Sequence, residues 1–277
     1  MSQTKLTSPY DFTGQTIVIT GGTGVLGGEL ARGLASLGAN VAIIGRNMEA
    51  GKRVLERIAE RAHNARLFAC DVLDPDAVRA AAVDIKQHFG RIDALINAAG
   101  GNNPKATANV TQKFFDLPAE ALRWVFELNV MGTILPSQVF SEVMVEQGFG
   151  SILNVTSMAG VRPLTGVGAY GAAKAAISNF TQWLAVHLAK EYSPNIRVNA
   201  IAPGFFLTEQ NRFLLTDRDT GELTLRGKSI IAHTPMARFG KPEDLLGAAS
   251  WLLSPAAAFV TGAVIPVDGG FSAFSGV

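Results

Sequence analysis

The chain contains one cysteine, has almost no net charge and lacks any long apolar run. The single Cys70 excludes an intramolecular disulfide, and its apolar neighbours Leu67, Phe68 and Ala69 predict a buried strand residue rather than a nucleophile or metal ligand. Lysine and arginine number 24 against 23 acidic residues, so the charge gives no reason to expect a nucleic-acid or membrane partner. The expected ligand is a small soluble molecule.

Patterns for targeting and metal binding are also missing. No apolar run reaches membrane-spanning length, and residues 1–14 lack the basic and apolar regions of a secretory signal. Metal-ligand spacing is absent among His63, His88, His187 and His233, so we expect no metal site. Together with the lone cysteine, these absences predict a cytoplasmic protein.

Glycine and apolar residues, by contrast, are plentiful. The 277 residues include 29 glycines, and 48% of the chain is hydrophobic, which is enough to bury a sizeable core. Neither a repeat nor a linker rich in proline or serine divides the sequence. We therefore expect one domain over residues 1–277.

Short β-branched runs alternate with longer helical patterns. The expected strands are Thr16–Thr20, Asn40–Gly45, Ala65–Cys70, Ala94–Asn97, Ser151–Thr156, Ile196–Ile201 and Val264–Val267. The expected helices are Gly27–Leu37, Met48–Arg61, Pro75–His88, Ala119–Glu146, Ala169–Glu191 and Pro242–Leu253. Such alternation is typical of parallel strands joined by crossover helices. The sequence predicts an α/β fold of the Rossmann type, a doubly wound parallel sheet of about seven strands flanked by helices.

One irregular stretch, Gly204–Arg238, is rich in polar residues and glycine and follows an expected strand. In open α/β sheets, ligands bind beside the carboxyl ends of the strands. A long segment at this place predicts a substrate lid, with plain disorder as the alternative.

A glycine-rich turn, Gly22-x-Gly24-x-x-Gly27, joins the first expected strand to the first expected helix. Glycines allow a tight turn and a close approach of the backbone to a pyrophosphate, while the helix N-terminus offers amide donors and a favourable dipole. Four glycines fall within Thr20–Gly27, which is more than a simple turn requires. The turn predicts a dinucleotide site.

The end of the second expected strand bears on the choice of dinucleotide. An acidic residue there would bind the 2′-hydroxyl of NAD, but the chain has Gly45-Arg46-Asn47. The Arg46 guanidinium suits the 2′-phosphate of NADP, so NADP(H) is favoured. NAD(H) stays possible if Arg46 only stacks on the adenine. Asp71, at the end of the third strand, is expected to accept from the adenine amine.

Tyr170 and Lys174 lie one turn apart on an expected helix, downstream of Ser157. An ammonium on the same helix face stabilises the phenolate, so we expect Lys174 to lower the pKa of Tyr170 from its usual value near ~10. This arrangement predicts tyrosine as a proton donor near neutral pH. Tyr-x-x-x-Lys alone would also fit an ordinary surface pair.

Several motifs in this order resemble the short-chain dehydrogenase/reductase family over essentially the whole chain. They are Thr20–Gly27, Asn97-Ala98-Ala99-Gly100, Asn129, Ser157, Tyr170-x-x-x-Lys174, Pro203-Gly204 and Val267-Asp268-Gly269-Gly270. One departure is Val25, which stands where short members usually have a glycine. Gly21, Gly24 and Gly27 instead match the spacing of the extended members, which bears on the detailed shape of the phosphate loop.

The resemblance implies catalysis by four residues and association into a homotetramer. Tyr170 would protonate the alkoxide, Lys174 would assist it and hold the nicotinamide ribose, Ser157 would orient the carbonyl oxygen, and Asn129 would bind a proton-relaying water. Local capping or a buried polar role is the alternative for Ser157 and Asn129. The expected cofactor contacts are Gly21, Thr23, Gly24, Val25, Leu26, Gly27, Arg46, Asn47, Asp71, Val72, Asn97, Ala98, Ala99, Gly100, Tyr170, Lys174, Pro203, Gly204, Phe206 and Thr208.

Within this family, four further runs look like the D-mannonate oxidoreductase, or fructuronate reductase, group. They are residues 101–106, 178–185, 202–208 and 266–272. This likeness implies a keto or hydroxy sugar acid as substrate, whose carboxylate needs a cation or amide donors. The candidates are Asn103, Lys105, Arg162 and Asn211, with Asn102 and Arg212 nearby; solvated loop charges are the alternative for each.

Two other functions stay open from the sequence. One is a reductase of the same family that acts on another sugar, a steroid or an acyl ketone. The other is a non-catalytic protein that senses dinucleotides, although such a protein would be expected to lose the acid, whereas Tyr170, Lys174, Ser157 and Asn129 are all present.

Overall fold

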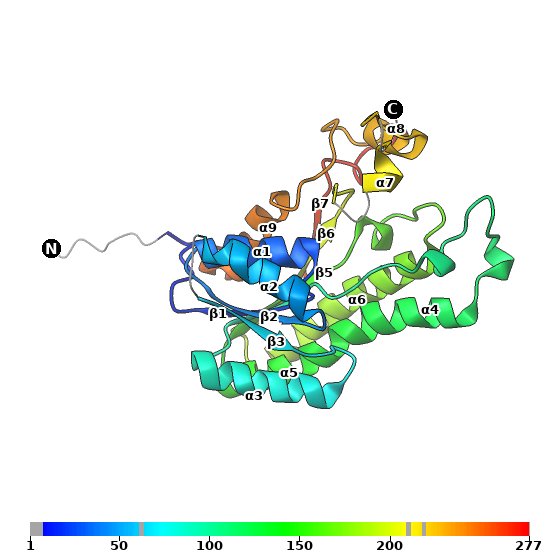
Figure 1. Cartoon of the computed structure of the whole chain (residues 1–277). Coiled ribbons are helices and arrows are strands. Elements are labelled where there is room, and N and C mark those ends of the chain that lie inside the picture. The colour runs from blue at the N-terminus through cyan, green and yellow to red at the C-terminus, as the bar shows by residue number, and fades with distance from the viewer. Residues whose placement is uncertain (1–7, 61–63, 209–211, 218–219, 277) are drawn as a thin grey trace.

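The computed structural model describes residues 8–60, 64–208, 212–217 and 220–276. Its strands form one seven-stranded sheet in the order β3-β2-β1-β4-β5-β6-β7, and every neighbouring pair is parallel (Figure 1). Their bounds are β1 Thr16–Thr20, β2 Asn40–Gly45, β3 Ala65–Ala69, β4 Ala94–Asn97, β5 Gly150–Val155, β6 Ile196–Pro203 and β7 Val264–Val267. The predicted strands are confirmed, with ends displaced by at most two residues.

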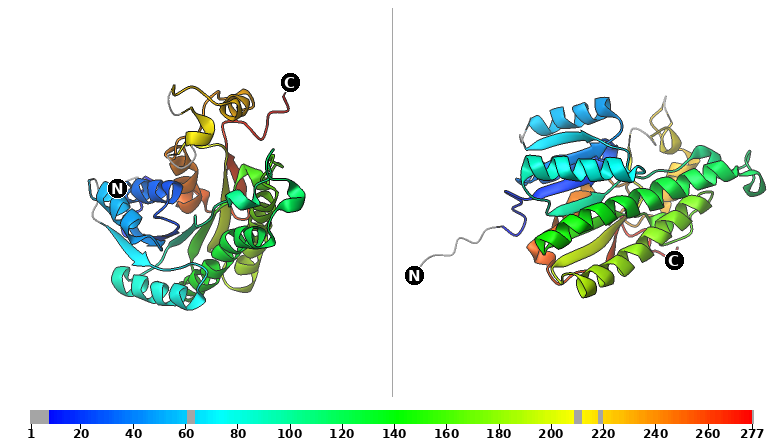
Figure 2. Two further views of the ribbon diagram at one scale, coloured as in Figure 1. Left: turned by 45° about the vertical axis from the view of Figure 1, so that its right-hand side comes forward. Right: turned by 90° about the horizontal axis from the view of Figure 1, so that it is seen from below.

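Helices cover both faces of the sheet (Figures 1 and 2). One face carries α1 (Val25–Ser36), α2 (Met48–Ala59) and α9 (Asp244–Leu253), and the other carries α3 (Pro75–Phe89), α5 (Gly132–Gln147) and α6 (Gly168–Glu191). Alternate residues of β1 serve the two cores, since Ile17 and Ile19 belong to one cluster and Val18 to the other. This is the predicted doubly wound, Rossmann-type arrangement.

Local side-chain chemistry sets several helix ends. The Asn47 side chain accepts from the amide of Ala50 at 2.9 Å and caps α2. Asp74 caps α3 in the same way, with Pro75 in the first turn, and Gly90 ends that helix in the left-handed conformation at φ 82°. These caps hold the helices at the strand ends where the crossovers begin.

The chain reverses its direction of travel between β1 and β4. It runs from β1 outward to β3 and then returns to β4 on the opposite side of β1. Crossovers therefore leave the carboxyl ends of β1 and β4 toward opposite faces, which opens a crevice between them. The turn after β1 and the segment after β4 both begin there.

The predicted helix Ala119–Glu146 is interrupted. The chain forms α4 (Ala119–Phe126), a π-helical segment (Glu127–Met131) and α5. A π-helix shifts the backbone hydrogen bonds by one residue and leaves a carbonyl for another donor. Here the Asn129 side chain donates to the carbonyl of Val125 at 2.8 Å, so the interruption depends on an interaction that the helical pattern does not reveal.

The prediction of an irregular stretch over Gly204–Arg238 was wrong in part. It contains α7 (Arg212–Leu215) and α8 (Leu225–Ala232), with Thr224 capping α8. Gly227 lets these two short helices approach closely, because a Cβ there would collide with the carbonyl of Leu215. The single-turn 3-10 helices of the described chain are Pro104–Ala106, Phe114–Asp116, Met158–Gly160 and Pro255–Ala257.

In the part of the chain that the structure describes, no helix combines the length and the apolar character needed to cross a membrane.

Candidate active site

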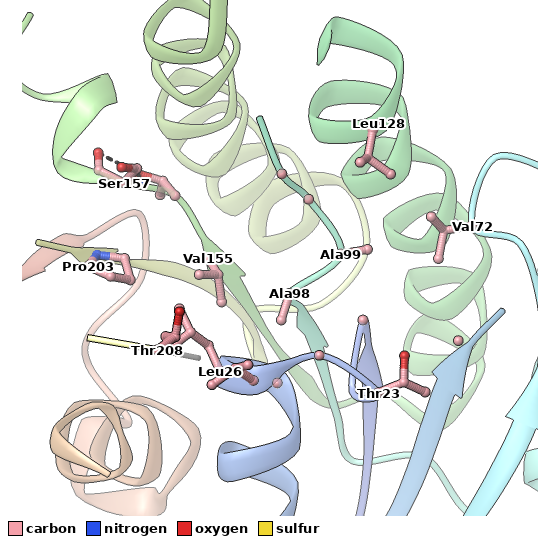
Figure 3. Close-up of a pocket in the computed structure, with 18 of the residues that line it drawn as sticks. Thr23, Leu26, Val72, Ala98, Ala99, Leu128, Val155, Ser157, Pro203 and Thr208 are labelled. Atoms are coloured by element: carbon pink, nitrogen blue, oxygen red, sulfur yellow. Dashed lines mark hydrogen bonds between the residues drawn. The ribbon is translucent and has the colours of Figure 1, made fainter. Parts of the chain in front are cut away.

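A cavity of about 750 Å³ lies at the carboxyl edge of the sheet. Figure 3 shows Thr23 and Val72 on one side of it and Ser157, Pro203 and Thr208 on the other. Twenty predicted residues line the cavity: Gly21, Thr23, Gly24, Val25, Leu26, Gly27, Arg46, Asn47, Asp71, Val72, Ala98, Ala99, Gly100, Ser157, Tyr170, Lys174, Pro203, Gly204, Phe206 and Thr208. The fold thus brings together residues separated by almost 190 positions in the sequence.

Six further lining residues were not predicted from the sequence. They are Gly45, Cys70, Gly101, Leu128, Val155 and Thr156. Each lies within two positions of a residue that was predicted to bind or react. Position alone, at the carboxyl ends of β3, β4 and β5, is the signal that could have found most of them.

The glycine turn after β1 packs backbone against backbone. Gly21 has φ 64°, and a Cβ there would lie 2.6 Å from the amide nitrogen of Ala99. A Cβ on Gly27 would lie 2.5 Å from the carbonyl oxygen of Gly21. No side chain caps the N-terminus of α1, which leaves its first amides to a phosphate. This cradle without side chains fits the pyrophosphate of a dinucleotide.

Arg46 and Asp71 face each other at the open end of the cavity. The Arg46 Nη1 lies 3.4 Å from the Asp71 Oδ2, and the two side chains are 64% and 40% exposed. Gly45 lies beneath Thr23, because a Cβ at position 45 would come within 2.5 Å of the threonine side chain. An acidic side chain at position 45 would collide with Thr23, so Arg46 is the nearest charged group on that strand end.

Ser157 caps a short helix and also contacts Tyr170. Its Oγ accepts from the amide of Ala159 at 3.1 Å, which caps the short helix Met158–Gly160. The same side chain hydrogen-bonds with Tyr170 and lowers the pKa of the phenol, while burial, the larger effect, raises it. Ser157 is thus held in place by the backbone while it touches the tyrosine.

The expectation that Lys174 lowers the pKa of Tyr170 is not met. Burial raises the pKa of Tyr170 above its ordinary value because a phenolate loses its hydration there. Burial also lowers the pKa of Lys174 to about 8, and its Nζ lies 5.7 Å from the centre of the Tyr170 ring. The ammonium instead donates to the carbonyl of Val155 at 2.9 Å. The spacing of one helical turn places Lys174 beside the Tyr170 ring, but the ammonium does not contact the phenol oxygen closely enough to lower its pKa.

Asn129 does not line the cavity but holds a residue that does. Its Nδ2 donates to the carbonyl of Gly101 at 2.7 Å, and its Oδ1 accepts from the amide of the same glycine at 3.2 Å. Both Nδ2 hydrogens are engaged, since Val125 takes the second. The water-binding role of Asn129 stays a prediction that depends on its Oδ1 and backbone atoms.

The prediction that Asn97 contacts the cofactor is not supported by its position. Asn97 is 1% exposed and does not line the cavity. Its Nδ2 donates to the Ser137 Oγ and to the Asn154 Oδ1, each at 2.9 Å. The side chain points into the protein because successive residues of a strand face opposite sides of the sheet.

The predicted substrate-binding residues lie outside this cavity. Lys105 is exposed, and Asn103 caps the short helix Pro104–Ala106 by accepting from the amide of Lys105 at 3.0 Å. Arg162 is exposed after the helix Met158–Gly160. Asn211 lies outside the described residues. Apart from Arg46 at the far end, Lys174 is the only lysine or arginine among the described residues that line the cavity.

Cys70 is buried as the sequence predicts, but it lies one residue beyond the end of β3. Burial raises the pKa of its thiol to about 11, so it is not a poised nucleophile. Over the described ranges, no group of three or more histidine, cysteine or acidic side chains is arranged to hold a metal ion.

Known proteins resemble this chain over nearly its full length. The profile of the family described as enoyl-(acyl carrier protein) reductase matches residues 13–272. The uncharacterized oxidoreductase UxuB of Bacillus subtilis is 48% identical over 276 residues, which are 96% of this chain and 98% of that protein. The 7α-hydroxysteroid dehydrogenase of Escherichia coli K12 is 34% identical and covers 93% of this chain and 94% of its own.

A solved structure from Haemophilus influenzae resembles the fold as well as the sequence. It is provisionally named a D-mannonate oxidoreductase, contains bound NAD and is 45% identical to this chain. The two superpose with a TM-score of 0.90 over 96% of this chain and 98% of that one. The cradle after β1, the Ser157, Tyr170 and Lys174 cluster and these relatives lead to one conclusion. This chain belongs to the short-chain dehydrogenase/reductase family and is an oxidoreductase that interconverts alcohols and carbonyls with a nicotinamide dinucleotide.

Proposed function

We propose that this protein interconverts D-fructuronate and D-mannonate, with NADP(H) preferred over NAD(H). The observation that carries the proposal is the 45% identity, over nearly both whole chains, to a structure provisionally named a D-mannonate oxidoreductase. The proposed catalytic residues are Ser157, Tyr170, Lys174 and Asn129.

The bound dinucleotide supplies or accepts the hydride. During reduction, Ser157 holds the carbonyl oxygen of the substrate, and Tyr170 donates a proton to that oxygen as it gains negative charge. The raised pKa of Tyr170 suits this direction, because it keeps the phenol protonated at neutral pH. In the oxidative direction the same group accepts the proton.

Lys174 acts beside the tyrosine. Its Nζ is held against the carbonyl of Val155, and a Cβ built on Gly100 would lie 3.1 Å from it, so the ammonium borders the floor of the cavity. In this place it can donate to the nicotinamide ribose. With its pKa lowered to about 8, Lys174 also exchanges protons more readily near neutral pH than an ordinary lysine.

The carboxylate of the sugar acid would be bound by the loops above the catalytic residues. The amide of Ala108 donates to the carbonyl of Gly166 at 2.8 Å, which joins the loop of Lys105 to the loop of Arg162. We propose that these two joined loops, with both cations, form a roof over the end of the cavity that holds Tyr170. The segment 204–238 is the proposed lid of this single domain, and Asn211 within it is a further amide candidate.

The preference for NADP(H) is supported by Arg46. Its guanidinium is exposed at the end of the cavity, and its only ionic partner among the described residues is the 40% exposed Asp71 carboxylate, 3.4 Å away. A 2′-phosphate offers a stronger, bidentate partner. We also infer a homotetramer, because Trp183 and Val186 on α6 expose 56% and 60% of their area.

A panel of substrates with both cofactors tests the proposal. Purified protein is assayed with D-fructuronate, D-mannonate, neutral sugar ketones and a 7-oxo steroid, each with NADH and NADPH. We expect the highest kcat/KM for fructuronate with NADPH. Absence of activity on every hexuronate would exclude the proposed substrate.

A reductase of uncharged ketones is the second candidate. It is favoured by the scarcity of cations, since Lys174 is the only lysine or arginine that the described chain places at the catalytic end of the cavity. A preference for a neutral ketone in the same panel would support this alternative.

A further inference from the structure

Five fully buried polar side chains lie behind the cavity and do not line it. They are Asn97 on β4, Asn154 on β5, Thr133 and Ser137 on α5, and Thr181 on α6, each at most 1% exposed. Burying polar groups among apolar residues is unfavourable unless they bond to one another. These five do so.

The first half of this network starts at the π-helical segment. The Thr133 Oγ1 donates to the backbone carbonyl of Asn129 at 2.9 Å, and the Ser137 Oγ donates to the carbonyl of Thr133 at 2.7 Å. Ser137 Oγ in turn accepts from the Asn97 Nδ2 at 2.9 Å. This half ties the helix that carries Asn129 to β4.

The second half ends on the helix of the proposed acid. The Asn97 Nδ2 also donates to the Asn154 Oδ1, and the Asn154 Nδ2 donates to the Thr181 Oγ1, both at 2.9 Å. Thr181 Oγ1 donates to the carbonyl of Ile177 at 2.8 Å. Ile177 lies on α6 between Lys174 and Thr181, so the network spans two strands and joins the two catalytic helices.

The network has a defined direction. Asn154 can meet both neighbours only with its oxygen toward Asn97 and its nitrogen toward Thr181. Ser137 and Thr181 each donate to a carbonyl one turn earlier in their helix, so each has an oxygen lone pair left to accept an asparagine amide. One geometry satisfies all of these bonds, which sets α5 and α6 at fixed positions relative to the sheet.

We propose that Asn154 and Thr181 are positioning residues that set the distance between Asn129 and Lys174. The two catalytic side chains meet above Gly100, where a built Cβ would lie 2.7 Å from the Asn129 Oδ1 and 3.1 Å from the Lys174 Nζ. Their backbones belong to different helices, and the buried amides span the gap between those helices. The inference depends on the proposed catalytic roles of Lys174 and Asn129.

A matched pair of variants at Thr181 tests this role. Thr181→Val keeps the shape but leaves the Asn154 amide without its acceptor, whereas Thr181→Ser keeps the hydroxyl. Thr16→Val is the control, since Thr16 is equally buried and its Oγ1 has no hydrogen-bond partner among the described residues. Each protein is assayed with whichever panel substrate the parent turns over fastest.

We expect Thr181→Val to lower kcat by about tenfold, because small misplacements of reacting groups are costly in rate. The midpoint of the pH profile of kcat should move, while the KM for the dinucleotide changes little. Thr181→Ser and Thr16→Val should match the parent. Ser137→Ala, at the other end of the network, should reproduce the altered pH profile and replaces Thr181→Val if that protein does not fold.

Two results would overturn the inference. One is a parental kcat and pH profile in Thr181→Val or Ser137→Ala, whatever their thermal stability. The other is an equal loss in Thr181→Ser, which would make packing rather than the hydroxyl responsible. The parent and the variants can also be compared without a substrate, by measuring the pH dependence of NADH binding through NADH fluorescence. This test therefore holds even if the proposed substrate is wrong.

Discussion

The cradle for the dinucleotide and the proposed roof over the substrate differ in how tightly the chain is packed. Around Gly21 and Gly27, backbone lies so close to backbone that a single Cβ would collide. In the roof, Lys105 and Arg162 are exposed, and Phe115 farther along the first loop is 89% exposed. The cradle therefore tolerates little change, whereas the roof can vary without disturbing the fold, which suits a part that selects substrates.

The largest effect is expected at the point where cradle and roof meet. Tyr170→Phe should lower kcat by ~10²–10⁴, the usual cost of losing a general acid, because only the phenol oxygen transfers the proton. Dinucleotide affinity, measured by NADPH fluorescence, should be unchanged because the ring keeps its packing. A kcat within about tenfold of the parent would contradict the role of Tyr170.

The second prediction concerns the buried ammonium of Lys174. Its folded pKa of about 8 lies below the ordinary 10.5, so the unfolded chain binds more protons between these values and the stability of the parent rises with pH there. In Lys174→Met this rise should vanish. The free energy of unfolding of the parent relative to the variant should increase by about 3 kcal/mol from pH 7 to pH 11.

Urea unfolding at a series of pH values measures this difference. Lys190→Met, which removes an exposed lysine from the same helix, serves as the control and should keep the parental dependence. A difference in the free energy of unfolding between the parent and Lys174→Met that stays constant with pH would show that the ammonium is well solvated.

The third prediction compares a glycine of the cradle, Gly21, with a glycine that has open space around it, Gly247. Gly21→Ala should weaken dinucleotide binding by at least about tenfold, because the residue has φ 64° and its Cβ would meet Ala99. Gly247→Ala, in α9 where a Cβ meets nothing within 4 Å, should bind normally and gain roughly 0.5–1 kcal/mol of stability. Isothermal titration measures dinucleotide affinity, and thermal melting measures stability. Equal dinucleotide affinity in the two variants would contradict a role of the glycine cradle in binding the cofactor.

The fourth prediction tests the open end of the cavity. Arg46→Ala should lower the ratio of kcat/KM with NADPH to kcat/KM with NADH by about tenfold or more. The reason is that the variant loses the charge-assisted hydrogen bonds from the guanidinium to the 2′-phosphate. Arg53→Ala, an exposed arginine on α2, should leave the ratio as it is. A parent that prefers NADH, or an unchanged ratio in Arg46→Ala, would refute the preference for NADP(H).

The smallest effect is expected in the roof. Lys105→Met should raise the KM for fructuronate by about two- to fivefold, the range of an exposed ion pair, and leave the KM for an uncharged ketone unchanged. Lys113→Met removes an exposed lysine farther along the same loop and should change neither KM. Equal effects of Lys105→Met on both substrates would exclude a role in binding the carboxylate.

Much of the architecture was predictable because it depends on local patterns. Short β-branched runs predicted the seven strands, and alternation with helices predicted their parallel order. The glycine spacing after β1 predicted the cradle. These features follow from the backbone preferences of a few adjacent residues, so no distant contact was needed to infer them.

Other features depended on distant partners. The interruption of the helix at Glu127–Met131 involves the pairing of Asn129 with Gly101, and α8 packs on α7 through Gly227. Asn97 faces Ser137 and Asn154 rather than the cavity. None of these partners is near in sequence to the residue that it constrains, except within segment 204–238.

The sequence by itself determined the family, the sheet and the four candidate catalytic residues, since their identity and order are local facts of the chain. The tertiary structure alone decided the electrostatics of Tyr170 and Lys174, because a pKa depends on burial and on which atoms a side chain meets. It also decided which cations reach the cavity and which buried amides join α5 to α6. Distances between elements arise from packing, and packing is a property of the whole fold.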